Sequence, residues 1–288
     1  MSILKEGYGI NNIYAYHKGE IKQGLDIGLP LMDKHIRFKP GQFVMINGLD
    51  NVGKTYFIMW YFLCLSMKHD LKWCIWSGEN ETWQMKRDLM TMIEGVNFKS
   101  IKFEKITMLS TMIDQWFTFI DNRKLYSHKE VLKIFQSQDV HGCLIDPFTG
   151  LNHDRRINQF ERNYQFCNDI REFCNKTKKT IYVNTHPQTE AARRVYGLEH
   201  TLKGYIQPPK KSDTEGGQAF ANRCDDFITI HRLTNHDKLW MLTEFHVRKI
   251  RDKETGGEMT FLDDPLRLDY NGGLGFTIGG YGALKKLR

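Results

Sequence analysis

Residues 48–55 constrain the fold of this chain more than any other feature, because their sequence GLDNVGKT fits the pattern Gly-x4-Gly-Lys-Thr. They follow an apolar run at 42–47 and precede a breaker-free apolar stretch at 56–67. In a turn from strand to helix, the glycines let backbone N–H groups face phosphates, and the helix N-terminus favours negative charge. The segment therefore predicts a nucleoside triphosphate site, and a glycine-rich turn with no ligand is the alternative.

Within this site Lys54 is expected to reach the β- and γ-phosphates, and the Thr55 hydroxyl is expected to bind Mg²⁺. The residues expected to bind ATP, or another NTP or dNTP, are Gly48, Asp50, Asn51, Val52, Gly53, Lys54, Thr55 and Tyr56.

Strands and helices alternate over the first two thirds of the chain, which is typical of a parallel sheet covered by helices on both faces. Strands are expected at 42–47, 72–77, 142–145 and 180–184, and helices at 56–67, 82–94 and 158–176. Residues 101–140 are ambiguous and predict a short strand followed by helices. Strand-like runs at 226–231, 239–247 and 259–262 predict antiparallel additions to the sheet. The predicted fold class is therefore α/β.

The formal net charge of +7 suits a polyanionic partner, of which nucleic acid is the commonest, although charge for solubility is the simpler explanation. The six cysteines form no CxxC pair and no cluster with zinc spacing, which favours a reducing, intracellular compartment. Residues 1–6 lack an apolar signal core, and no apolar run reaches about 18 residues. We expect a cytoplasmic protein with no membrane span.

Two carboxylates are candidates for the chemistry of hydrolysis. Asp146 ends the apolar run 142–145, at the sheet edge where ligands bind in open α/β folds, and is expected to hold Mg²⁺. Glu79 follows the strand at 72–77 and is expected to orient the attacking water. Glu81 is the competitor for that role, but it is better explained as an acid in the first helical turn. For both glutamates a simple helix-capping role is the alternative.

Three further candidates lie at strand ends. His186, after the strand at 180–184, could contact the γ-phosphate, or could be an ordinary surface histidine. Lys249 and Arg251 are two residues apart near a strand end, so both should point to one face and could clamp a triphosphate of this chain or of a neighbour. A solvated basic strand end is the alternative for this pair.

The polar stretch 187–217 is long for a loop in a compact domain, which indicates a functional or mobile segment. It leaves the sheet at the expected catalytic edge, and its cations could contact a phosphate backbone. A surface loop without function is the alternative. The candidate DNA-binding residues are Arg193, Arg194, Lys203, Lys210 and Lys211.

With these motifs placed, the chain from about residue 25 to 269 resembles the RecA-like ATPase domain of the DnaB-like, superfamily-4 replicative helicases, and within them the phage and Twinkle-like branch. The matching segments, in order, are 24–26, 39–42, the phosphate loop, 77–79, 144–147, 185–187, 216–219 with 225–226, and 249–251 with 255–257. Each later segment is loose by itself, and their order and spacing make the set specific.

This resemblance implies an ATP-dependent motor that translocates on single-stranded DNA and unwinds duplex DNA as a hexameric ring, and the compact single module suggests a phage protein in the host cytoplasm. It also implies that His186 is a γ-phosphate sensor and that Arg251 acts as a finger on the neighbouring subunit's ATP. A separate primase or loader is a further expected partner. Residues 26–288 would form the motor, and residues 1–25 an extension whose segment 10–17 could strap onto a neighbour.

Two other functions stay open on the residues. A RecA-like recombination or strand-annealing ATPase would share the fold and the DNA loop but would form filaments without unwinding. A regulatory ATP-binding switch would have no DNA partner, and the cations at 249–251 and in 187–217 argue against it. The order of motifs after residue 225 favours the helicase over the recombinase.

Overall fold

A nine-stranded sheet forms the centre of the computed structural model, which describes residues 7–154 and 156–287. The strands are β1 (Phe43–Asn47), β2 (Trp73–Ser77), β3 (Phe117–Phe119), β4 (Gly142–Asp146), β5 (Thr180–Thr185), β6 (Asp226–Arg232), β7 (Leu242–Lys249), β8 (Leu266–Tyr270) and β9 (Phe276–Thr277). Their order in the sheet is β3-β2-β4-β5-β1-β6-β7-β8-β9. The strands from β3 to β6 in this order are parallel, and β7, β8 and β9 are antiparallel.

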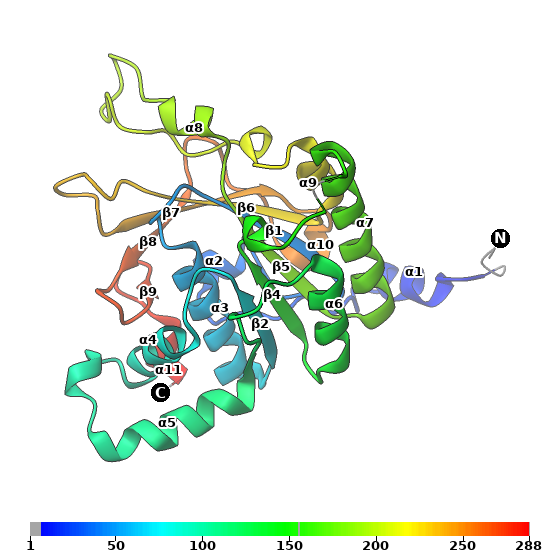
Figure 1. Cartoon of the computed structure of the whole chain (residues 1–288), viewed down its shortest axis with the longest axis horizontal. Helices are drawn as coiled ribbons and strands as arrows, with labels where there is room; N and C mark the ends of the chain where they lie inside the picture. The colour runs from blue at the N-terminus through cyan, green and yellow to red at the C-terminus, as the bar shows by residue number, and fades with distance from the viewer. Residues whose placement is uncertain (1–6, 155, 288) are drawn as a thin grey trace.

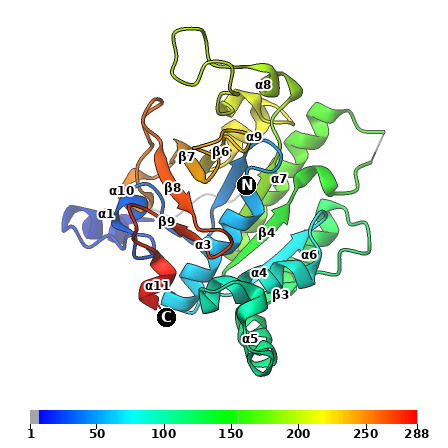
Figure 2. The same ribbon diagram turned by 90° about the vertical axis from the view of Figure 1, so that its left-hand side faces the viewer.

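Helices cover both faces of the sheet (Figures 1 and 2). They are α1 (Ile10–His17), α2 (Pro30–Asp33), α3 (Lys54–His69), α4 (Thr82–Glu94), α5 (Phe103–Trp116), α6 (His128–Ser137), α7 (Gln159–Thr177), α8 (Thr189–Arg193), α9 (Gln218–Arg223), α10 (Lys253–Gly256) and α11 (Ala283–Leu287). One core lies between the sheet and α3, α4, α5 and α11, and a second lies between the sheet and α6, α7 and α9. The predicted α/β fold class is confirmed.

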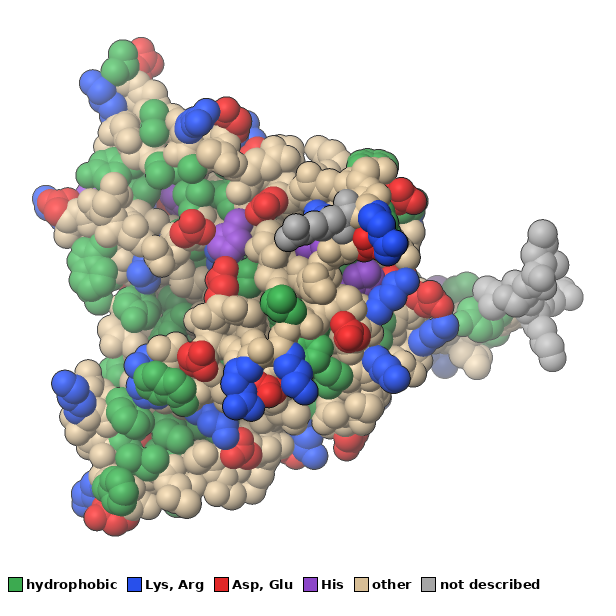
Figure 3. Space-filling model, in the orientation of Figure 1, with side chains coloured by type: hydrophobic (Ala, Val, Ile, Leu, Met, Phe, Trp, Pro, Cys, Tyr) green, Lys and Arg blue, Asp and Glu red, His purple; other side chains and the backbone are tan. Residues whose placement is uncertain are grey.

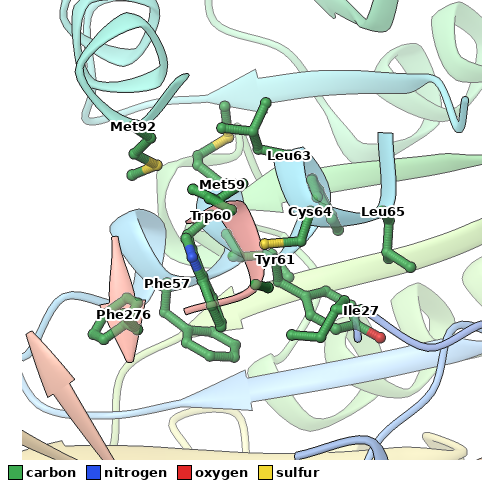
Figure 4. Close-up of a cluster of buried hydrophobic side chains, with 14 of the residues drawn as sticks. Ile27, Phe57, Met59, Trp60, Tyr61, Leu63, Cys64, Leu65, Met92 and Phe276 are labelled. Atoms are coloured by element: carbon green, nitrogen blue, oxygen red, sulfur yellow. The ribbon is translucent and has the colours of Figure 1, made fainter. Parts of the chain in front are cut away.

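Helix α3 carries much of the first core (Figure 4), since its residues from Phe57 to Ser66 are all buried. The ring of Trp60 packs edge-on against Phe276 at 5.2 Å, which fixes β9 to this helix. Burial of one such side chain contributes about 1.5–3 kcal/mol. The helix begins after Gly53 and ends before Asp70, and both of these flanking residues have left-handed backbone conformations. The start of α3, and with it the phosphate loop, is thereby fixed against the sheet.

The expected strands and helices of the parallel part are present, but the order within 101–140 is wrong in the prediction. The helix α5 comes first, the three-residue strand β3 follows, and α6 completes the segment. Leu109 and Ile113, one helical turn apart, are the buried residues of α5, so a helical apolar stripe determines this region. The strand that follows lies at the edge of the sheet and leaves Thr118 exposed.

The prediction for the C-terminal strands is correct only in part. The strand β6 is parallel to β1 rather than antiparallel, and β7 begins at Leu242 rather than at residue 239. Residues 259–262 form no strand, and Phe261 and Leu262 are 81% and 75% exposed. Because these side chains have no buried face to pack against, their apolar character does not produce a strand there. The next antiparallel strand is instead β8.

The N-terminal helix α1 projects from the body on the side where α10 lies (Figures 1 and 2). None of its eight residues is buried. Of the extension expected over residues 1–25, residues 1–6 lie outside the described residues. Within 7–154 and 156–287, no helix has both the length and the apolar character needed to cross a membrane.

Candidate nucleotide-binding site

The loop between β1 and α3 has the backbone conformation that a phosphate site requires. Asn51 and Gly53 have positive φ angles of 60° and 91°, which turn successive N–H groups to one side. A Cβ atom on Gly48 would lie 2.5 Å from the carbonyl oxygen of Ile230, so only glycine fits between this loop and β6. The conformation of the loop therefore depends on its close contact with β6 as well as on its own glycines.

Lys54 lies folded into this loop. Its ammonium donates to the carbonyl oxygens of Gly48 and Leu49 at 2.8 and 2.9 Å, and only 8% of the residue is exposed. Burial lowers the pKa of the Lys54 ammonium, while the carboxylates of Asp146, Asp50 and Glu79 act in the opposite direction. A buried ammonium whose hydrogen-bond acceptors are two neutral carbonyls would be stabilised by the negative charge of a bound polyphosphate.

The side chains of Thr55 and Asp146 meet at the start of α3 and the end of β4. The Thr55 hydroxyl donates to a carboxylate oxygen of Asp146 at 2.8 Å, and Asp146 is 1% exposed. The other carboxylate oxygen accepts from the Asn184 amide at 2.7 Å. Ser77 and Asn80 each donate to Asp146 at 3.3 Å. The buried carboxylate of Asp146 thus has hydrogen-bond donors from three other segments of the chain.

The donor set at Asp146 fits Mg²⁺, which prefers oxygen ligands and is held in proteins by one or two side chains together with substrate phosphates. The oxygens of Thr55 and Asp146 supply that partial set. Among the described residues, no group of three or more His, Cys, Asp or Glu side chains is placed to hold a metal ion by itself. A phosphate-bridged ion is thus the form of Mg²⁺ binding that these residues could support.

His186 lies between the phosphate loop and the end of β2. Its Nδ1 atom is 2.7 Å from a carboxylate oxygen of Asp50 and 3.3 Å from the Lys54 ammonium. Its Nε2 atom is 3.6 Å from a carboxylate oxygen of Glu79. The imidazole therefore lies between the lysine of the loop and Glu79, the candidate for orienting water.

A cavity of about 980 Å³ opens over these residues. It is lined by the phosphate loop, by Glu79, Asp146 and His186, and by α4 side chains such as Arg87. Glu81 is not among its lining residues, whereas Glu79 is, which fits the choice of Glu79 made from the sequence. Tyr56 lines the cavity too, and its hydroxyl accepts a hydrogen bond from the Gly275 N–H at 2.8 Å.

Lys249 and Arg251 lie away from this cavity. Lys249 pairs with Phe227 at the beginning of β6, whereas the phosphate loop follows the carboxyl end of the neighbouring strand β1. A strand of five residues separates these edges by about 15 Å. The guanidinium of Arg251 is paired with the buried carboxylate of Asp225 at 2.7 Å, and its side chain is 55% exposed. Neither cation can reach the chain's own nucleotide site in this arrangement.

Residues 187–217 leave and return to the site at His186. The Glu215 N–H donates to the carbonyl oxygen of His186 at 2.9 Å, and Pro187 bridges Thr214. Residues 194–207 form a hairpin-like arm, with the Gln207 N–H bonded to the Arg194 carbonyl. The arm projects beside α8 (Figure 1).

The five candidate DNA-binding cations differ in their availability. Lys203 and Lys210 are exposed, and Lys211 is half-buried. Arg193 is paired with Glu190 on the surface. Arg194 is paired with Asp213 at 2.5 Å and half-buried, so it holds the base of the arm together. Lys203 and Lys210 are therefore the cations most available to a phosphate backbone.

Sequence reasoning missed the residues that support Asp146. The sequence placed Asn184 in the strand at 180–184 and gave it no role in the site. In the structure its amide donates a hydrogen bond of 2.7 Å to the carboxylate of Asp146. A polar residue inside an otherwise apolar strand was the available signal, since buried polar groups are placed where they have partners. Asn80 had no such signal, because it lies in a polar turn.

Comparison with known proteins agrees with this geometry. No family model matches the chain. The chain is 25% identical over 253 residues to the Twinkle homolog protein, chloroplastic/mitochondrial, of Arabidopsis thaliana. That match covers 81% of this chain and 34% of the relative, so the chain spans about a third of the relative's length.

Solved structures show the same fold. The ATPase domain of G40P matches with a TM-score of 0.74 at 14% identity, covering 95% of this chain and 99% of that one. A DnaB-like replicative helicase, described with its interactions with primase, matches with a TM-score of 0.73 at 14% identity, over 96% and 67% of the two chains. The KaiC-like protein PH0186 of Pyrococcus horikoshii gives 0.55 at 15%, over 91% and 98%. The chain has the RecA-like ATPase fold, and the predicted resemblance to the DnaB-like helicase ATPase domain is confirmed.

Proposed function

We propose that this chain is the motor of a replicative-type DNA helicase, which hydrolyses ATP or a related NTP to move along single-stranded DNA and unwind duplex DNA. The observation that carries this proposal is the position of His186. Its ring contacts Lys54 and Asp50 of the phosphate loop, and its carbonyl oxygen accepts a hydrogen bond from the Glu215 N–H, near the end of the segment 187–217. His186 directly precedes the candidate DNA-binding segment, so loss of the terminal phosphate beside its ring could change the position of that segment.

The residues of the cavity have separate roles in this proposal. The loop 48–55 binds the phosphates, with Lys54 on the β- and γ-phosphates and Tyr56 beside the nucleotide. Thr55 and Asp146 would hold Mg²⁺, whose charge supports phosphoryl transfer when it is bound. Glu79 orients the attacking water, and its half-exposed carboxylate near His186 is accessible to that water. His186 senses the terminal phosphate.

Arg251 completes the site of a neighbouring subunit. It lies at the opposite edge of the sheet from its own phosphate loop, and its Nη1 atom is 2.7 Å from a carboxylate oxygen of Asp225. A guanidinium carries five N–H donors, so most of them stay available for the phosphates of another subunit's nucleotide. The proposed assembly is a homo-oligomer, as a hexameric ring around single-stranded DNA.

The N-terminal extension supports the same assembly. Helix α1 and the residues just before it expose large apolar side chains, and Figure 3 shows some hydrophobic side chains on the part that projects from the body. They are Tyr8, Ile10, Ile13, Tyr14 and Tyr16. We propose that residues 1–25 strap onto a neighbour and that residues 26–288 form the motor. A separate primase or loader as a partner, and a phage origin with action in the host cytoplasm, follow from the same resemblance.

Three measurements test this function. The helicase proposal expects ATP turnover that rises on addition of single-stranded DNA, displacement of a strand from a forked duplex, and six-fold particles with an ATP analogue and DNA. Turnover on DNA without strand displacement, together with filaments in micrographs, would establish the recombination or annealing ATPase instead. Turnover that does not respond to DNA would contradict both DNA motors.

A further inference from the structure

The end of the segment 187–217 is continuous with the short helix α9. Two glycines, Gly216 and Gly217, connect the segment to α9, and a Cβ atom on Gly216 would lie 2.4 Å from the ring of Phe220. Phe220 is buried against the rings of Phe148 and Phe166. The C-terminal end of the segment is therefore packed, through α9, against the second core.

Lys249 holds the C-terminal end of α9. Its ammonium donates to the carbonyl oxygens of Ala221, Asn222 and Cys224 at 3.0, 3.1 and 2.7 Å. The last carbonyls of a helix have no partner within the helix and need one from elsewhere. A lysine ammonium has three N–H donors, and here all three are used inside the same chain. Lys249 has no donor left for a phosphate in this arrangement.

Asp225 makes the second connection between α9 and the segment 249–251. Its carboxylate is 1% exposed and accepts from Arg171 at 2.5 and 2.8 Å and from the Phe43 N–H at 2.9 Å. Arg171 also donates to the carbonyl oxygen of Arg223, the last residue of α9. The same carboxylate binds Arg251 at 2.7 Å. Helix α9, Asp225 and Arg251 are thus linked through one buried carboxylate.

We infer that Lys249 is a positioning residue that clamps α9 to the strand β7, so that the finger segment 249–251 and the C-terminal end of the segment 187–217 move together. Asp225 and Arg171 form the other half of this clamp. The inference rests on the proposed function for its meaning, since Arg251 reports on a neighbour's nucleotide and the segment contacts DNA. It assigns to Lys249 a role inside its own subunit.

Hydrogen exchange of the 288-residue chain without nucleotide or DNA tests the clamp directly. Lys249→Met removes the three donors and keeps a side chain of similar length. The amides of residues 218–225 should exchange about tenfold faster, since charge-assisted hydrogen bonds to helix carbonyls are lost. Lys249→Arg, which restores donors, should recover part of the protection, and the amides of β1 and β4 should not change.

Two matched variants give the control. Lys285→Met removes an exposed lysine of α11 and should leave the exchange of residues 218–225 unchanged. Arg251→Ala removes the finger but leaves all three Lys249 contacts, so the same amides should stay protected. Arg171→Met, which removes the bond to the Arg223 carbonyl, should speed exchange in this region as Lys249→Met does.

The affinity for single-stranded DNA is the second readout. Lys249→Met should raise the dissociation constant for an oligonucleotide several-fold, whereas Arg251→Ala should lower turnover without that loss. The clamp is wrong if Lys249→Met leaves exchange at 218–225 at the wild-type rate and lowers turnover as Arg251→Ala does, because Lys249 would then be a phosphate ligand. Faster exchange in Lys249→Met, with a wild-type protein that ignores DNA, would keep the clamp and refute the helicase function.

Discussion

The hydroxyl of Thr55 donates a hydrogen bond of 2.8 Å to the carboxylate of Asp146, although the two residues are ninety-one positions apart in the sequence. This contact joins the start of α3 to the end of β4 at the carboxyl edge of the sheet. It brings together the two oxygen ligands that the sequence predicted for Mg²⁺. The geometry around it leads to the first prediction.

Asn184→Ala should raise the Mg²⁺ concentration that ATP turnover requires. The Asn184 amide fixes one oxygen of Asp146, and loss of such a supporting partner typically costs about 10–100-fold in metal affinity or activity. The measurement is the Mg²⁺ concentration for half-maximal ATP turnover. Asn163→Ala, at a buried asparagine that bonds to Gly216 instead, should leave this concentration unchanged. Equal Mg²⁺ dependence in both variants would contradict the role of Asn184.

Lys54→Ala should lower ATP turnover by about 10²–10³-fold, as the loss of one preorganised donor at a developing charge does. The buried ammonium is already aligned by the carbonyls of Gly48 and Leu49, so no exposed lysine can replace it. Steady-state ATP hydrolysis measures the effect, with Lys99→Ala at an exposed position as the control. Retained turnover in the Lys54 variant would remove the basis for a phosphate site at residues 48–55.

Arg251→Ala subunits should inhibit wild-type subunits when the two are mixed, because each lacks the group that serves its neighbour. Loss of a transition-state arginine costs about 10³–10⁵ in rate in related enzymes. A wild-type neighbour also completes the site of an Arg251→Ala subunit, so the decisive mixture is Arg251→Ala with Lys54→Ala, each inactive by itself. ATP turnover should reappear in this mixture, because the Lys54→Ala subunit offers its arginine to the intact phosphate loop of the Arg251→Ala subunit. Arg267→Ala, at another half-exposed arginine, provides the control. No recovery of turnover when Arg251→Ala and Lys54→Ala subunits are mixed would show that Arg251 does not act across subunits.

Lys203→Ala combined with Lys210→Ala should reduce the affinity for single-stranded DNA. Both side chains are exposed, and each lost phosphate contact lowers the salt slope by about 0.7. Binding isotherms at several salt concentrations measure both quantities. Lys285→Ala with Lys286→Ala removes the same charge from exposed α11 positions, so an equal effect there would indicate a general effect of charge.

His231 should make the protein less stable in acid. Burial lowers the pKa of His231 to about 4, against about 6.5 in an unfolded chain. Between these values the unfolded state binds the additional proton, so the free energy of unfolding decreases as pH falls from 6.5 to 4. The decrease is at most about 3 kcal/mol for this one group.

Denaturant unfolding at several pH values measures this dependence. His231→Gln removes the titrating group, so its stability should fall less between pH 6.5 and 4 than that of the wild type. His17→Gln, at an exposed position of α1, should retain the wild-type dependence. Parallel curves for His231→Gln and the wild type would show that His231 does not titrate in this range.

The sequence predicted the parallel part of the sheet because local pattern and tertiary burial agree there. Each of β1, β2, β4 and β5 is buried along its whole length, and such strands read as short apolar runs between turns. The phosphate loop was predictable for the same reason, since its glycines serve a local backbone conformation. The apolar run around residue 261 wrongly predicted a strand. A short apolar run does not show whether another part of the chain packs against it, and here Phe261 is exposed.

Contacts between distant segments could not be predicted in this way. The sequence suggested that Lys249 and Arg251 act as a pair, on the ground that residues two apart in a strand share a face. In the structure their partners differ, because Lys249 lies against the carbonyls of α9 and Arg251 against Asp225. Only the three-dimensional structure shows which acceptors lie within hydrogen-bonding distance of each cation.

The separation of Arg251 from its own phosphate loop, by the length of the central strands, has a consequence for stoichiometry. If Arg251 acts across subunits, each contact is heterologous, with one subunit offering its phosphate loop and the next offering its arginine. An open row of n subunits then contains n − 1 complete sites, and closing the row into a ring adds the last one. Turnover per subunit would therefore depend on protein concentration, and a free subunit would bind NTP without an effective means of hydrolysing it.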